Sequence, residues 1–255
     1  MKMSLKNILS VAALCLMTQV SVAQVTVNTD PKDFGLWAGV DLDFSLGKKF
    51  DLGVGADLRT ADGFNSLSRW SAGLSVDFKP TKILSFGAGY TFIDSHYEPS
   101  YTSKGNIVDE YWRIKNRFYF GAKVKGKFGV VRPSLRLRYQ GTNEAEVSIK
   151  KYASDGTTRK SNKTKASEYE SFLRTKAQVD FKTKSCFEPF VSFELWNDAG
   201  NSMSLDKTRL SAGTDIKLNK HNAISVGYVR NFFSGETDDD NNNHNALSIG
   251  YKIKL

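Results

Sequence analysis

Basic side chains recur at alternate positions in several stretches of the chain, a spacing at which they can act together. This basic wall consists of Arg113, Lys115, Arg117, Arg132, Arg136, Arg138, Arg174 and Lys176. An acidic counter-face consists of Asp41, Asp43, Asp51, Asp57, Asp77, Glu188 and Glu194. Cations on one surface attract anions, whereas carboxylates facing them neutralise the charge by pairing. The chemistry expected of these residues is therefore either internal ion pairing or a surface that favours anions.

The segments that carry these charges alternate apolar and polar residues. Apolar side chains occupy every second position from Phe34 to Phe44, and the same alternation occurs from Trp112 to Val124 and from Leu247 to Leu255. Because successive side chains of a β-strand point to opposite faces, the pattern predicts strands with one apolar and one charged face. The chain contains about eleven such segments of about ten residues each, the length of a tilted transmembrane strand.

Composition excludes several other classes of protein. Of the 255 residues, 40% are hydrophobic and 25% are charged, and the mean hydropathy of -0.39 is too polar for a helical membrane protein. The aromatic content of 12% is too high for a disordered chain. With 2 cysteines, neither a disulfide scaffold nor a cysteine-based zinc site can be assembled. An all-β domain remains.

The N-terminus predicts a cleaved export signal. Lys2 and Lys6 lead into an apolar run from Ile8 to Met17, and small residues favour cleavage after Ala23. The run is shorter than the roughly 20 residues that span a bilayer as a helix. We therefore expect a signal peptide at residues 1–23 and one exported domain at residues 24–255.

The connections between strands distinguish a transmembrane barrel from a soluble β-sandwich or a lipocalin-like barrel. Tight connections, such as Gly47-Lys48, alternate with long polar ones. The long connections are expected near residues 60–68, 94–109, 142–168, 197–206 and 233–244. Aromatic residues on the apolar face also gather at strand ends, as Phe50 and Phe78 do beside tight turns and Trp112 does toward a long loop. Both features favour an up-and-down antiparallel β-barrel in the outer membrane.

We expect about twelve strands in this barrel. Bacterial outer-membrane barrels have an even number of strands, and residues 24–32, where Val25 and Val27 alternate with polar residues, could supply the opening strand. If two weak segments are loops, ten strands form instead. Residues 24–32 could alternatively thread the lumen.

Several segments resemble known bacterial barrels. The terminal Tyr251-Lys252-Ile253-Lys254-Leu255 is similar to the signal by which such barrels are recognised for assembly, although a terminal Phe is commoner there than Leu255. Residues Asp33 to Val40, Phe86 to Tyr90, Asn116 to Tyr119 and Pro189 to Ser192 resemble a family of outer-membrane barrels catalogued only as a domain of unknown function. This resemblance implies the fold and no activity.

Three functions for the barrel remain open from the sequence. A structural or narrow-lumen barrel would pair the basic wall with the acidic counter-face, and an anion-preferring channel would leave the wall free to select small anions. A third alternative is a surface-loop binding protein, because the basic segment at residues 150–165 could dock on lipopolysaccharide. The expected partners are outer-membrane lipid, lipopolysaccharide and the barrel assembly machinery. No nucleic acid, cofactor or metal is expected.

An enzymatic function has little support. Asp94, His96 and Glu98 would share one face if their strand continues that far, and an Asp-His pair could activate water there. Ser95 is adjacent to His96 and points to the opposite face, which argues against a serine-histidine dyad. We therefore expect no enzyme, with a loop-based Asp-His hydrolase as the alternative.

Overall fold

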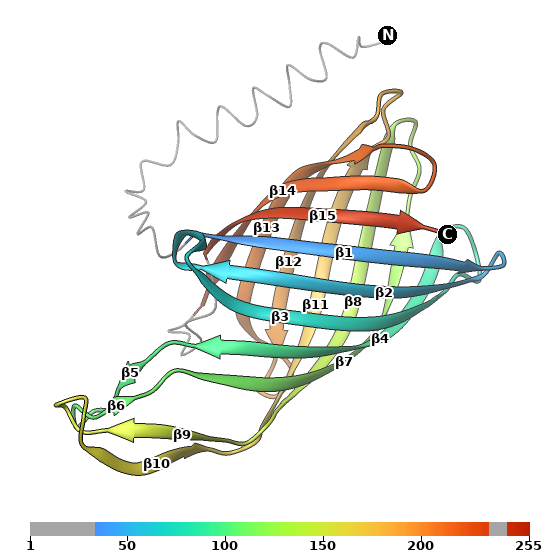
Figure 1. Cartoon of the computed structure of the whole chain (residues 1–255). Helices are drawn as coiled ribbons and strands as arrows, with labels where there is room; N and C mark the ends of the chain where they lie inside the picture. The colour runs from blue at the N-terminus through green and yellow to red at the C-terminus, as the bar shows by residue number, and fades with distance from the viewer. Residues whose placement is uncertain (1–33, 235–243) are drawn as a thin grey trace. The chain divides into compact units, whose positions relative to one another are not determined.

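The computed structural model describes residues 34–234 and 244–255, which form a closed β-barrel with a smaller sheet beyond one end (Figure 1). In chain order, the barrel strands are β1 (Phe34–Leu46), β2 (Phe50–Ala61), β3 (Ser66–Phe78), β4 (Leu84–Tyr97), β7 (Tyr111–Lys125), β8 (Val131–Glu144), β11 (Glu168–Phe181), β12 (Phe187–Asp198), β13 (Ser204–Lys217), β14 (Asn222–Phe233) and β15 (Asn245–Lys254). The all-β barrel expected from the alternating pattern is confirmed.

The described residues form eleven barrel strands, where about twelve were expected with ten as the alternative. Every neighbouring pair is antiparallel except β1 and β15, which are parallel from the pair Phe34 and Asn245 to the pair Asp43 and Lys254. An odd number of strands that alternate in direction leaves the first and last strands pointing the same way, so a parallel seam must close the cylinder. The proposed opening strand at residues 24–32 and the signal at residues 1–23 lie outside the described residues.

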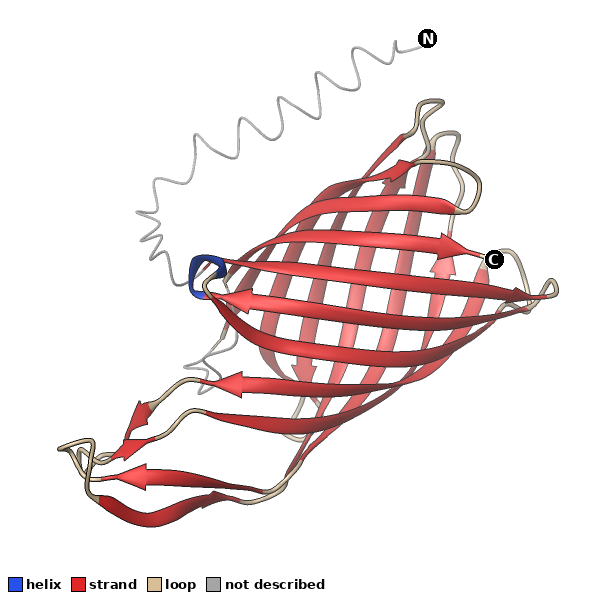
Figure 2. Cartoon of the chain, in the orientation of Figure 1, coloured by secondary structure: helices blue, strands red, loops and turns tan. Residues whose placement is uncertain are grey.

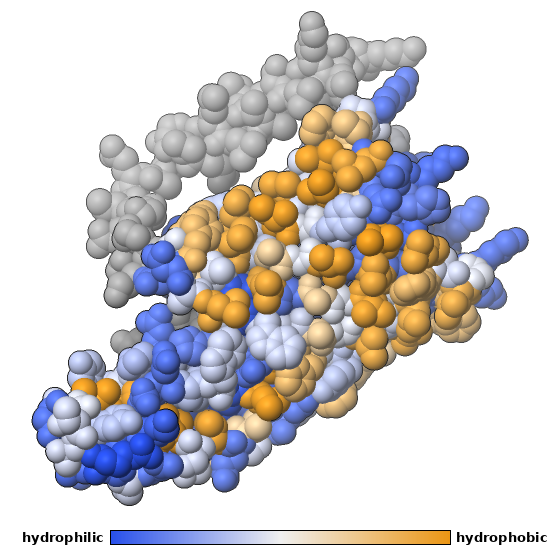
Figure 3. Space-filling view, viewed as in Figure 1, coloured by the Kyte–Doolittle hydropathy of each residue, from blue (hydrophilic) through white to orange (hydrophobic). Residues whose placement is uncertain are grey.

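The two faces of the strands are assigned by exposure. Phe120 is 63% exposed, whereas Arg113 and Glu194 are each 3% exposed. Large apolar side chains therefore cover the outside of the barrel and charged ones fill the inside, the reverse of a soluble protein. Figure 3 shows apolar residues over the outer surface of the barrel.

Asn116, a polar residue on the apolar face, forms a hydrogen bond with a side chain of the neighbouring strand. Asn116 lies among the apolar residues of β7, and its side-chain oxygen accepts a 2.5 Å hydrogen bond from the hydroxyl of Tyr90 on β4. Both side chains thereby satisfy a polar group that would be costly to leave unpaired against an apolar medium.

The strand connections differ at the two ends of the barrel. At the turn end, residues 47–49, 79–83, 126–130, 182–186 and 218–221 form the short connections. At the loop end, the connection expected to be long near residues 60–68 is short, because β2 and β3 extend almost to a single 3-10 turn at Asp62–Phe64. Residues 199–203 are likewise a short connection, and residues 235–243 lie outside the described part.

The two longest connections are not irregular loops, which corrects the expectation for residues 94–109 and 142–168. They contribute β5 (Ser100–Tyr101), β6 (Ile107–Val108), β9 (Val147–Tyr152) and β10 (Arg159–Lys165) to a four-stranded sheet, the loop-end sheet, in the order β10-β9-β6-β5 (Figure 2). Val108 and Ile149 are buried in it. Burying apolar surface from both connections stabilises strands that neither would form alone.

No helix within the described residues is long and apolar enough to cross a bilayer, a finding that concerns helices and not strands.

Candidate functional site

The barrel interior has two unlike halves. The packed half is formed by the inward side chains of β7, β8, β11, β12 and β13, and the open half by those of β1 to β4. Both come from the same alternation of inward and outward residues. They differ because arginine and lysine predominate among the inward residues of the first, and glycine, serine and aspartate among those of the second, where Trp37 and Arg59 are long exceptions.

Glu194 on β12 is the centre of the packed half. Its carboxylate accepts hydrogen bonds from Arg136 of β8 at 2.8 Å and from Arg174 of β11 at 2.9 Å, and Arg209 of β13 lies 3.9 Å away. Register explains the gathering, because Glu194 lies opposite Lys176 on one side and opposite Arg209 on the other. Several strands thus aim guanidinium groups at one buried carboxylate.

Two tryptophan rings extend this cluster across the lumen. The guanidinium carbon of Arg174 lies 3.7 Å from the centre of the Trp196 ring, and the Lys207 ammonium lies 4.1 Å from the same centre. Trp37 on β1 lies beside Arg59 at 4.0 Å and beside Arg209 at 4.9 Å. Cations over aromatic faces are stabilised by about 0.5–2 kcal/mol each. The contacts connect the packed half to β1 and β2.

A second carboxylate neutralises the basic wall near the loop end. Glu144 on β8 lies 2.6 Å from Arg113 and 2.5 Å from Lys115, both on β7. Arg113 also donates to the backbone oxygen atoms of Ala145 and Ala166, at 2.9 and 2.7 Å. These side chains are almost fully buried. A buried charge of this kind requires partners, and Arg113 has several.

The remaining members of the basic wall have weaker contacts. Arg117 donates a 3.1 Å hydrogen bond to the hydroxyl of Thr142, and Arg138 lies over the ring of Tyr119 at 3.9 Å. Arg132 and Lys176 are on the interior face and form no ion pair within residues 34–234 and 244–255. All eight residues of the wall thus lie inside the barrel, with unequal pairing.

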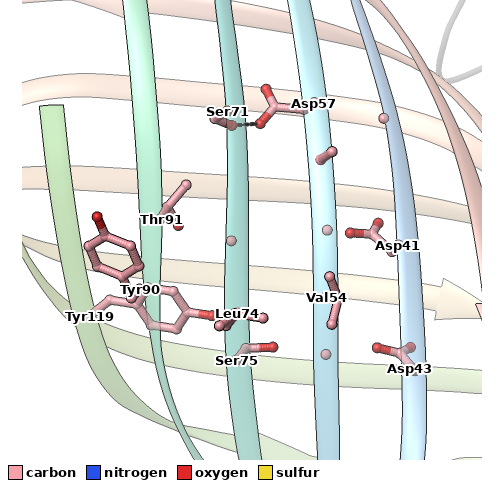
Figure 4. A pocket seen from close by; sticks show the side chains of 15 residues that line it. Asp41, Asp43, Val54, Asp57, Ser71, Leu74, Ser75, Tyr90, Thr91 and Tyr119 are labelled. Atoms are coloured by element: carbon pink, nitrogen blue, oxygen red, sulfur yellow. Dashed lines mark hydrogen bonds between the residues drawn. The ribbon is translucent and has the colours of Figure 1, made fainter. Parts of the chain in front are cut away.

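The open half contains a cavity of about 250 Å³. Asp41, Asp43 and Asp57 line it together with Ser75 and Thr91, as Figure 4 shows. The hollow arises because β2 places glycine at alternate inward positions, where a side chain would otherwise project. A Cβ atom at Gly55 would lie only 2.8 Å from a carboxylate oxygen of Asp41. Small residues and carboxylates therefore define this half.

The acidic counter-face contacts the basic wall only in part. Asp57 pairs with Arg59 of its own strand at 3.1 Å and accepts a hydrogen bond from Ser71. Further pairs link Asp51 with Lys79, and Glu188 with Lys182 and Lys217. Asp41, Asp43 and Asp77 form no ion pair with any described residue. The carboxylates that neutralise the wall are thus Glu194, which the sequence indicated, and Glu144, which it did not.

The sequence reasoning missed Glu144, Gln140, Arg209, Trp37 and Trp196. All five have the inward parity of their strands; extending the alternation by a few residues reaches Glu144, Gln140, Arg209 and Trp196, whereas Trp37 lies within the segment from Phe34 to Phe44. Glu144 fell in a segment interpreted as loop. The tryptophans gave no signal, because aromatic residues were expected on the outside.

The Asp-His arrangement considered for hydrolysis does not form as expected. The His96 ring lies 3.4 Å from the carboxylate of Glu110 and packs on Trp112 at 5.1 Å, instead of pairing with Asp94. Ser95 is buried and points to the other face. No group of metal-ligating side chains occurs within the described residues.

The chain matches one family model, and its barrel can be compared with solved structures. The translocator domain of the autotransporter NalP from Neisseria meningitidis superposes with a TM-score of 0.48 and 11% identity, covering 74% of this chain and 70% of that one. No protein with a curated description matches. The model of the family described as Protein of unknown function (DUF2490) matches residues 34–243. Because this match covers most of the barrel, the chain belongs to that family.

Proposed function

We propose that this chain is a barrel of the bacterial outer membrane, exported by a cleaved signal peptide, whose lumen is held closed by internal charge pairing. In this role it acts as a structural or narrow-lumen barrel. Its apolar exterior supports insertion in a membrane, because a soluble protein of this size would not expose so much continuous apolar surface.

The cluster around Glu194 is the observation on which the proposal rests. Its arginines and Trp196 come from the neighbouring strands β8, β11, β12 and β13, and Arg209 reaches across the lumen to Trp37 of β1. Opening a wide path would require separating buried ion pairs and ring contacts at the same time. Breaking one buried pair costs about 3–5 kcal/mol, so the closed state is strongly favoured.

An anion-preferring channel is the second candidate, and a specific feature favours it. Three donor atoms of the cluster, Nε of Arg136, Nε of Arg174 and Nε2 of Gln140, have no hydrogen-bond acceptor within the described residues. A small anion passing through could accept these hydrogen bonds. Against this, the cavity in the open half is lined by Asp41, Asp43 and Asp57, which repel anions.

Planar-bilayer recording of the purified chain distinguishes the two candidates. For a closed barrel we expect no single-channel events across a wide voltage range, and Arg136→Gln with Arg138→Gln should lower stability without creating anion current. A channel would instead show wild-type events with a reversal potential favouring anions. The same double substitution would then shift that potential, most strongly at low salt.

Location is tested separately by fractionation. An inserted barrel should remain in the membrane after carbonate extraction and should migrate differently on a gel before and after heating. Recovery in a soluble fraction would contradict membrane insertion.

A further inference from the structure

Lysines are distributed evenly around the turn end of the barrel. Each of the five short connections, counted with the strand residue next to it, carries two lysines, and the end of β15 carries two more. These turn-end lysines are Lys48, Lys49, Lys79, Lys82, Lys125, Lys127, Lys182, Lys184, Lys217, Lys220, Lys252 and Lys254. The connections themselves contain no aspartate or glutamate. Such a one-sided distribution indicates a polyanionic partner.

Four of the turn-end lysines form ion pairs within the barrel. Lys79 pairs with Asp51, Lys182 and Lys217 pair with Glu188, and Lys252 pairs with Asp215 at 3.0 Å. The other eight form no ion pair with a described residue, and all eight are exposed at the surface. They are Lys48, Lys49, Lys82, Lys125, Lys127, Lys184, Lys220 and Lys254. Lys125 and Lys254 have the inward parity of their strands, and the other six lie in the connections themselves. Each of the five connections therefore carries uncompensated charge at the rim.

Apolar side chains lie exposed beside these lysines. Ile83 is 60% exposed, Phe128 is 71% exposed and Leu218 is 53% exposed, each in a connection that also carries lysine. Ile83 further lines a groove of about 310 Å³ together with Lys48, Lys49 and several more turn-end lysines. A surface that presents apolar tips and ammonium groups together matches a membrane interface, where hydrocarbon and headgroups meet.

We propose that the turn-end lysines bind the phosphate headgroups of anionic phospholipids in the leaflet at that end of the barrel. The occupant is a lipid surface, because the lysines surround the barrel rather than form one patch for one protein partner. They also lie directly beyond the apolar belt, next to outward aromatic residues such as Phe50 and Phe187. The proposal rests on the membrane insertion proposed above.

Competition between spin-labelled lipids tests this inference. The full chain is folded into vesicles of phosphatidylcholine, and the association of spin-labelled phosphatidylglycerol with the barrel is compared with that of spin-labelled phosphatidylcholine. Each lysine that meets an anionic surface contributes about a five-fold preference, corresponding to about 1 kcal/mol. We expect wild type to favour phosphatidylglycerol several-fold, and high salt to reduce the preference.

The test variant replaces lysines that have no ion pair, Lys48→Gln, Lys82→Gln, Lys127→Gln and Lys184→Gln. Its preference for phosphatidylglycerol over phosphatidylcholine should fall several-fold below that of the wild type, because half of the lysines without an ion pair are removed. The matched control makes the same charge change at the other end of the barrel, with Lys104→Gln, Lys150→Gln, Lys160→Gln and Lys163→Gln, and should retain the wild-type preference.

Two failures are distinguishable in this experiment. If the barrel folds with its heat-sensitive gel shift but holds both lipids equally, the headgroup proposal is wrong and membrane insertion stands. If neither lipid is immobilised and no gel shift occurs, insertion itself has failed. If only the control variant lost the preference for phosphatidylglycerol, the lysines that bind the anionic lipid would lie at the loop end, and the inference would be wrong.

Discussion

The packed and open halves of the lumen follow the same strand pattern and reach opposite results. In the packed half, long cationic side chains converge on Glu194 and Glu144 and fill the space with ion pairs and ring contacts. In the open half, glycine and short acidic side chains leave a cavity of about 250 Å³. Alternation determines which side chains point inward, and their length determines how much of the interior they fill.

The difference also changes how charge is tolerated. Arginines of the packed half are buried and held by carboxylates, amides and rings. Asp41 and Asp43 line a cavity and form no ion pair with a described residue, so water must solvate them. A charge in the open half should therefore be replaceable at little cost, whereas one in the packed half should not.

The largest effect is expected for Glu194→Gln. The substitution preserves shape and removes the charge that holds Arg136 and Arg174, so it should lower the free energy of unfolding by about 3–5 kcal/mol. Asp41→Asn is the matched change in the open half and should cost less than about 1 kcal/mol. Urea unfolding of each variant, monitored by the gel shift of the folded barrel, measures both free energies of unfolding. Equal costs would remove the distinction between the halves.

A smaller effect is expected when arginine is placed on either side of one strand. Leu74→Arg puts a charge on the outer face and should cost about 2–4 kcal/mol in a bilayer. Ser75→Arg points the same side chain into the cavity beside Asp43, where room and opposite charge are present, and should be milder. Unfolding in lipid vesicles gives the comparison. If Ser75→Arg proved the more disruptive, the inside and outside faces would be reversed.

The smallest effects are expected when an inward glycine of each half is replaced by alanine. A Cβ atom at Gly121 would lie 2.3 Å from the backbone oxygen of Leu137, which cannot move away, so Gly121→Ala should cost about 1–3 kcal/mol. At Gly55 the nearest atom is a carboxylate oxygen of Asp41, which can rotate, so Gly55→Ala should cost less than about 1 kcal/mol. Thermal unfolding of the two variants ranks them, and the reverse order would contradict the assigned contacts.

The strands and their two faces could be predicted from the sequence, because the alternation of inward and outward side chains is a local property with a period of two residues. The charged residues of β7, β8 and β11 were assigned to the interior on this basis. The number of strands was not predictable, since it depends on how the first and last strands meet, and β1 joins β15 in parallel.

Which charges meet inside the barrel was decided by the tertiary structure. Arg136 reaches Glu194 across 58 residues of sequence because the registers of β8, β11 and β12 align them at one level of the cylinder. Glu144 pairs with Lys115 because β8 continues beyond the point where its alternation is clear. Side-chain types are local information, whereas register is set jointly by all the strands that close the barrel, so the pairing of charges cannot be deduced from any segment alone.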